Sequence, residues 1–269
     1  MNVVRPPAVA GLFYPGEPRA LRSTLHAMLA GAPGSAIEGR PKLLIVPHAG
    51  YVYSGRIAAS AYGLLKAQRA RVRRVILLGP THRVAVRGVA ISSASGFATP
   101  LGVIELDSDL MARLRRHPSV VASDVAHAAE HSLEVQLPFL QIVLTDFTLV
   151  PLAVGNIADD QLADLLGEIW GDEETLVVVS SDLSHYRSYS AAQEIDRVTV
   201  DRILACAGGI DHEHACGATP INAALAVASR AGLQARLLAM GNSGDTAGDR
   251  ARVVGYCAIA FEPAHDARH

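Results

Sequence analysis

Short apolar segments alternate with longer segments of helical spacing along most of this chain. Continuous apolar character, without polar residues at alternate positions, is typical of strands that are covered on both faces. Alternation of such strands with helices predicts an α/β domain with a mostly parallel central sheet flanked by helices. The expected strands are 42–47, 73–79, 147–154, 175–181, 235–240 and 251–261.

The segments between these strands carry helical spacing. Pro138 should kink or break one of them, because proline removes a backbone donor and clashes with the preceding turn. Thr219 followed by Pro220 predicts a helix start, with Thr219 as the N-cap residue. The expected helices are 55–68, 107–117, 132–144, 158–170, 190–206 and 219–232.

The chain has 269 residues, half of them hydrophobic, so one domain over 1–269 with a sizeable core is expected. We find no internal repeat and no low-complexity linker, and we expect the tip 31–41 and the tail 264–269 to be disordered. A formal charge of −2 argues against a nucleic-acid partner, because such proteins carry a basic excess.

Other compositional signals favour a cytoplasmic protein with no membrane partner. No apolar run approaches the roughly 20 residues of a membrane span, and the N-terminus lacks the pattern of a signal peptide. Three scattered cysteines are too few for a disulfide framework.

Polar residues follow several of the expected strands. His48 follows the first, His82 the second, and Asp182 and His185 follow the strand 175–181. Sites in open α/β sheets collect outside the carboxyl ends of the strands, so these side chains are candidates for one cleft. A lone histidine at a strand end is more often structural than a ligand. Two at adjacent ends are able to converge on one ion, and imidazole suits zinc, copper and iron.

Three further stretches carry candidate side chains. On a helical turn, Asp182 and His185 would share a face, where the carboxylate orients the imidazole as a general base; the alternative is a capping Asp beside a surface His. His127, His131 and Glu134 have helical spacing but no HExxH pattern, and His131 and Glu134 either face the cleft or form a pair on the helix surface. Cys216 precedes a helix start, which favours the thiolate.

Five motifs support a family resemblance. They are, in order, PHAGYVYSG, GPTHR, EHSLEVQLPF, SSDLSHY and CGATPI. Together with the opening VVRPPAVAGLFYP, they resemble the Memo family, called AmmeMemoRadiSam system protein B in bacteria and archaea. The resemblance runs from about Val3 to about Pro263. It implies a fold similar to that of class III extradiol dioxygenases, the LigB-like fold.

The resemblance also implies a set of site residues. Carried across motif by motif, His48, His82 and Cys216 surround a metal position, and Asp182 and His185 line the cleft as catalytic residues. The histidine of the EHSLE motif, His131, is assigned to the same cleft, as a catalytic residue rather than a metal ligand. Class III dioxygenases hold Fe(II) with two histidines and a carboxylate, whereas here a cysteine replaces the carboxylate. A thiolate favours copper(I), zinc or electron-rich iron and is itself oxidisable, so the fold does not fix the reaction.

Several functions stay open on this basis. The first is a redox-type protein that binds iron or copper, with zinc as a further option, and acts on an unknown small molecule; a ring-cleaving dioxygenase is its special case. The second is a metal-free module that binds a peptide or phospho-ligand in the same cleft through protonated histidines. A third is a thiol hydrolase that uses Cys216 with His185. The family name also implies a functional association with a radical SAM protein and AmmeMemoRadiSam protein A.

Overall fold

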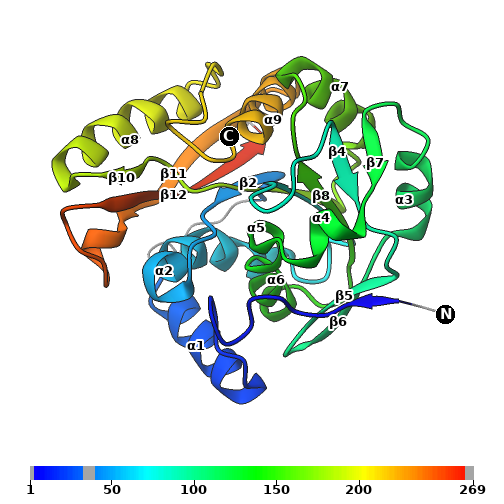
Figure 1. Cartoon of the computed structure of the whole chain (residues 1–269), viewed down its shortest axis with the longest axis horizontal. Coiled ribbons are helices and arrows are strands. Elements are labelled where there is room, and N and C mark those ends of the chain that lie inside the picture. Colours follow the sequence, from blue (N-terminus) through cyan, green and yellow to red (C-terminus); the bar gives the residue numbers. More distant parts are fainter. Residues whose placement is uncertain (1–2, 33–39, 264–269) are drawn as a thin grey trace, which may run out of the picture.

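A large mixed sheet forms the centre of the molecule (Figure 1). The computed structural model describes residues 3–32 and 40–263, so the expected disordered tail 264–269, and 33–39 of the expected tip, lie outside the described residues. The strands of the sheet run in the order β10-β12-β2-β9-β3-β8-β4-β7, and β11 pairs with β12. Their bounds are β2 Leu43–Val46, β3 Arg74–Pro80, β4 Val89–Ile91, β7 Val120–Ala122, β8 Thr148–Val154, β9 Thr175–Ser180, β10 His185–Arg187, β11 Leu233–Asn242 and β12 Val253–Pro263.

The four central strands β2, β9, β3 and β8 are parallel and almost entirely buried. They correspond to four of the expected apolar runs, and the expectation of an α/β fold with a large central sheet is confirmed. On both sides of these four strands the sheet continues with an antiparallel pair. β12 is antiparallel to β2 and to β11, and β4 is antiparallel to β8. The short 243–252 connection leaves no room for the crossover that a parallel β11–β12 pair would need.

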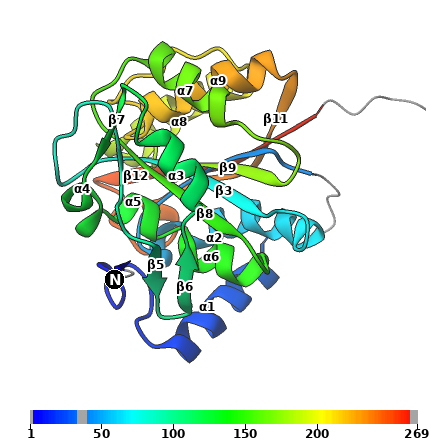
Figure 2. The same ribbon diagram turned by 90° about the vertical axis from the view of Figure 1, so that its right-hand side faces the viewer.

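Helices cover both faces of this sheet, as two perpendicular views show (Figures 1 and 2). On one face α9 packs on β2, β3 and β9 and is covered by α7, and on the other α2 packs on β2, β11 and β12. The longer helices are α1 Pro18–Ala30, α2 Tyr51–Tyr62, α3 Ser108–Leu114, α6 Leu137–Val143, α7 Asp159–Ile169, α8 Tyr189–Leu204 and α9 Ala218–Arg230, with short helices α4 Asp124–Ala128 and α5 His131–Glu134. No helix within 3–32 and 40–263 is both long and apolar enough to cross a bilayer.

Three of the expected helices show how the local predictions fared. Pro138 breaks the expected helix 132–144, as predicted, into α5 and α6. The N-cap of α9 is Gly217 rather than Thr219, so the prediction of an N-cap at Thr219 was wrong. Helix α2 begins at Tyr51, directly after the PHAG segment, four residues earlier than expected.

A second, small sheet lies beside the large one and includes the start of the described chain (Figure 1). It consists of β1 Val4–Arg5, β5 Gly96–Thr99 and β6 Gly102–Glu105. After β1, the segment 6–17 runs back to the helices α2 and α5, where the backbone N–H of Tyr51 donates to the carbonyl of Phe13. This N-terminal segment therefore forms one wall beside the carboxyl end of β2.

Candidate metal centre

The carboxyl ends of the parallel strands bring three of the expected site residues together. His48 lies two residues after β2, His82 two residues after β3, and Asp182 two residues after β9. The fourth side chain comes from a helix: His131 is the first residue of α5. Helix α5 lies directly on the end of β3, because Gly79 has no side chain there; a Cβ on Gly79 would lie 2.8 Å from Oγ of Ser132.

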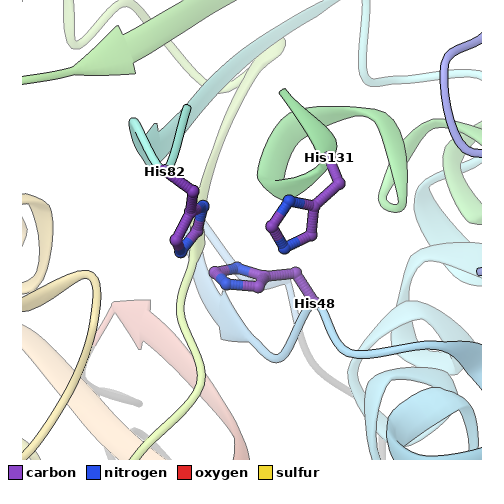
Figure 3. Close-up of side chains that lie close together, drawn as sticks. All are labelled: His48, His82 and His131. Atoms are coloured by element: carbon purple, nitrogen blue, oxygen red, sulfur yellow. The ribbon is translucent and has the colours of Figure 1, made fainter. Parts of the chain in front are cut away.

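The imidazoles of His48, His82 and His131 point toward one another (Figure 3). One nitrogen from each ring lies within 4.8 Å of the other two, a grouping that suits a single metal ion. The ring centroids are 5.2 Å apart for His48 and His82, 5.3 Å for His48 and His131, and 4.6 Å for His82 and His131. His48 is only 2% exposed. The expected pair His48 and His82 therefore does converge, with His131 as the third member.

Hydrogen bonds around His48 determine which ring nitrogen carries the proton. Nδ1 of His48 lies 2.9 Å from Oγ of Ser180, and that hydroxyl donates its only proton to the carbonyl of Ser132. Ser180 also accepts a hydrogen bond from the side-chain amide of Gln136. Nδ1 of His48 must therefore be the donor, which leaves Nε2 with a free lone pair, the form in which a neutral imidazole binds a metal.

Glu130 lies close to Nδ1 of each of the other two histidines and hydrogen-bonds to that of His82. Its Oε1 lies 2.9 Å from Nδ1 of His82 and 3.4 Å from Nδ1 of His131. Its Oε2 accepts the backbone N–H of His82 at 2.6 Å. These hydrogen bonds outweigh the effect of burial and lower the pKa of Glu130 to about 2, so the carboxylate is charged.

The electrostatic environment keeps two of the three histidines neutral. Burial, together with the neighbouring imidazoles, holds the pKa of His48 well below its usual range. Burial and His82 lower the pKa of His131 to about 4, although Glu130 acts in the opposite direction. Neutral imidazoles have lone pairs to offer, so this environment favours a cation ligand over an anion.

Cys216 lies beside His48, one residue before Gly217, the N-cap of α9. Its Sγ is 3.4 Å from Nε2 of His48. Gly217 permits this approach, because a Cβ there would lie 2.7 Å from Cβ of Ser181. Burial, with the nearby Asp182, raises the pKa of Cys216 to about 12. The expectation that the helix N-terminus favours the thiolate was therefore wrong for the metal-free protein, because burial outweighs the helix dipole.

Asp182 and His185 do not form the helical pair that their spacing suggested. The residues between β9 and β10 are not helical, and Oδ1 of Asp182 accepts the backbone N–H of His48 at 2.7 Å. Burial raises the pKa of Asp182 to about 7. Nδ1 of His185 donates to the carbonyl of Leu183, so its Nε2 is the free acceptor. Asp182 and His185 thus bond to separate backbone groups rather than to each other.

The other two members of the HAAEHSLE stretch face away from the cluster. His127 belongs to α4, is buried, and bonds through Nε2 to the carbonyl of Ala90. Glu134 is fully buried and accepts hydrogen bonds from Arg5, from the backbone N–H of Val9 and from the hydroxyl of Tyr14. Glu134 therefore anchors the N-terminal segment, and only His131 of the three joins His48 and His82.

The donor set fits a transition-metal ion. Two of the three converging imidazoles have Nδ1 hydrogen-bonded, and the buried Nδ1 of His131 has no hydrogen-bond partner among the described residues. Imidazole nitrogens with an adjacent thiol suit zinc, copper or iron. Ser180 and Glu130 contact the cluster but were not indicated by the sequence: Ser180 lies inside the expected strand 175–181, and nothing in linear spacing shows that Glu130 turns back toward His82.

Comparisons with known proteins agree with this architecture. Residues 5–260 match the model of the Memo family, described as Memo-like protein. MEMO1 family proteins of Methanopyrus kandleri and Aquifex aeolicus are 38% and 33% identical to the chain, in each case over 96% of it and over 98% and 99% of the relative. The crystal structure of the uncharacterized protein JW3007 from Escherichia coli K12 has a similar fold, with a TM-score of 0.51 at 13% identity, covering 82% of this chain and 99% of that one. With a family match over nearly its whole length and relatives above 30% identity, the chain belongs to the Memo family.

Proposed function

We propose that this chain binds one redox-active transition metal, iron or copper, through Nε2 of His48, His82 and His131, with Cys216 as a fourth ligand. The observation that carries the proposal is the convergence of three imidazoles with neighbouring groups arranged around their Nδ1 atoms. Cys216 belongs to the proposal because its sulfur lies 3.4 Å from Nε2 of His48. Ligands of one tetrahedral zinc-type ion are separated by roughly the same distance, about 3.5 Å.

A bound iron or copper ion would supply one-electron redox chemistry at this position. The residues around the ion would accept and release protons. Asp182 is buried and has a pKa raised to about 7, so it is able to gain or lose a proton near neutral pH. His185 has its Nδ1–H held by Leu183, which leaves Nε2 to accept a proton from a small molecule in the cleft.

The alternatives are less well supported by the environment of the cluster. A metal-free module for a peptide or phospho-ligand requires protonated imidazoles, whereas burial lowers the pKa of His48 and His131. A thiol hydrolase requires a reactive thiolate, whereas burial raises the pKa of Cys216. Ring-cleaving dioxygenase activity is the narrower form of the proposal, and oxygen uptake with catechol-type compounds checks it. The association with a radical SAM protein and AmmeMemoRadiSam protein A stays a prediction.

Elemental analysis of protein purified anaerobically from its own host tests the proposal. We expect about one iron or copper ion per chain, and loss of most of it in His48→Ala and in His131→Ala. His26→Ala is the matched control, because His26 is an exposed residue of α1 outside the cluster. Thermal unfolding of each variant establishes that it is folded. Stoichiometric metal in both folded site variants would contradict the proposal.

A further inference from the structure

One buried carboxylate lies against two of the three converging histidines. Glu130 is 1% exposed, and its Oε1 lies 2.9 Å from Nδ1 of His82 and 3.4 Å from Nδ1 of His131. Nδ1 of His131 is buried and has no hydrogen-bond partner within the described part of the chain. Oε1 of Glu130 is thus placed to accept a proton from that nitrogen, at a distance 0.5 Å longer than its distance to Nδ1 of His82.

The position of Glu130 is determined by backbone donors on both sides of the cluster. It is the N-cap residue of α5, where its Oε1 accepts the N–H of Ser132 at 2.9 Å. Its Oε2 accepts the backbone N–H of His82 at 2.6 Å. Glu130 therefore connects the loop after β3 with the start of α5, and so sets the distance between two histidines from separate elements.

We infer that Glu130 is a positioning residue that holds His82 and His131 with the proton on Nδ1, so that both Nε2 lone pairs point toward His48. This inference rests on the proposed function, because the positioning of the two rings serves metal binding. A carboxylate behind a metal-binding histidine orients the ring and increases the basicity of its free nitrogen. Here the carboxylate of Glu130 lies behind two rings, and the hydroxyl of Ser180 lies behind the third, that of His48.

Glutamine cannot replace Glu130 without loss, although it has nearly the same shape. Both oxygens of Glu130 act as acceptors, Oε1 from His82 and Ser132 and Oε2 from His82. Whichever way a glutamine amide is turned, its NH₂ group faces an N–H donor. Glu130→Gln should therefore release His82 and His131 from a single protonation form while it preserves the volume of the side chain.

Nitrogen NMR of the histidine rings in metal-free, full-length protein tests the inference without any metal. In the wild type we expect His82 and His131 to carry the proton on Nδ1. Glu130→Gln should convert both to mixtures of the two tautomers and leave His48 unchanged. Ser180→Ala is the matched variant and should give the opposite pattern, a change at His48 alone, because Ser180 bonds to Nδ1 of that ring.

Titration with Zn²⁺ is the second arm of the test. We expect Glu130→Gln to bind Zn²⁺ about 10- to 100-fold more weakly than the wild type, the usual effect of removing such a partner. Unchanged tautomers of His82 and His131 in folded Glu130→Gln, or an unchanged Zn²⁺ affinity, would overturn the inference. So would a wild-type His82 with its proton on Nε2, a result that does not depend on any variant folding. A wild type that binds no metal but has the expected tautomers would instead overturn the proposed function.

Discussion

At the scale of residues, the arrangement of the histidine cluster depends on the ring nitrogens that do not face the proposed metal position. Nδ1 of His48 faces Ser180, and Nδ1 of His82 faces Glu130. A structural histidine in this chain has a different pattern: His127 bonds through Nε2 to a backbone carbonyl, and its ring lies against Phe97. The convergence of three imidazoles, rather than burial of histidine as such, separates the candidate ligands from a packing residue.

Replacing the thiol should change which metal the site prefers. Cys216→Ser exchanges a soft sulfur for a hard oxygen next to His48, so we expect copper(I) affinity to fall by at least about tenfold and zinc affinity to fall less. Competition titrations with a chromophoric chelator measure both affinities. Cys206→Ser is the control, because Cys206 lies at the end of α8, outside the cluster. Equal loss for both metals would exclude a role of the sulfur in metal choice.

At the scale of elements, the short segment 130–134 contacts the histidine cluster on one side and the N-terminal segment on the other. Glu130 and His131 face the candidate metal centre, whereas Glu134 faces the N-terminal segment and bonds to Arg5 at 2.5 Å. Phe13 of that segment lies against the ring of His131, with 4.8 Å between the centroids. The N-terminal segment therefore supports the cluster from outside, through the same short helix α5 that contributes a proposed ligand.

Breaking the buried ion pair should destabilise the fold strongly. Arg5→Met leaves the charge of Glu134 without its cation in a site where neither side chain is more than 6% exposed. We expect the free energy of unfolding to fall by about 3–5 kcal/mol. Arg187→Met is the control: it removes an exposed pair with Glu213 and should cost less than about 1 kcal/mol. Urea unfolding measures both, and similar losses in the two variants would argue against the anchoring role.

A second element-scale prediction concerns pH. Asp107 caps α3 and pairs with Arg74 at 2.6 Å; burial raises the pKa of Asp107, but the N–H of Leu110 and Arg74 outweigh it and hold the pKa below its usual 3.8. A lowered carboxyl pKa contributes stability above the unfolded value, and this stability is lost as pH falls through the folded value. Asp107→Asn keeps a good cap, so we expect a loss of about 1 kcal/mol at neutral pH that disappears in acid. A pH-independent loss in urea unfolding would refute this account.

The sequence predicted the buried strands of the central sheet better than the elements around them. Strands β2, β3, β8 and β9 coincide with unbroken apolar runs, because strands covered on both faces tolerate few polar residues. Strands of two or three residues, such as β1 and β7, carry no periodicity and were missed. Helix α1 was also missed, although its buried residues Leu21, Leu25 and Leu29 recur every four positions after a proline start.

At the scale of the whole molecule, the order of strands explains both what could be predicted of the site and what could not. β9 lies between β2 and β3, so the residues that follow these three parallel strands meet at one edge of the sheet. For this reason the positions of His48, His82 and Asp182 could be predicted from the ends of the expected strands. The pairing of Glu130 with His82 depends on the position at which α5 packs against β3, and no local sequence pattern indicates such a long-range contact. The same holds for Ser180, whose hydroxyl bonds to a residue 132 positions away.

X-ray absorption spectroscopy of the metal-loaded protein tests the central claim most directly, because it reports the ligands of the ion itself. The proposed centre predicts a first coordination shell with three imidazole nitrogens and one sulfur, from His48, His82, His131 and Cys216. The sulfur contribution should vanish in Cys216→Ser, and one imidazole should vanish in His131→Ala. A spectrum of oxygen ligands alone, unchanged in both variants, would contradict the claim that these residues form a metal centre.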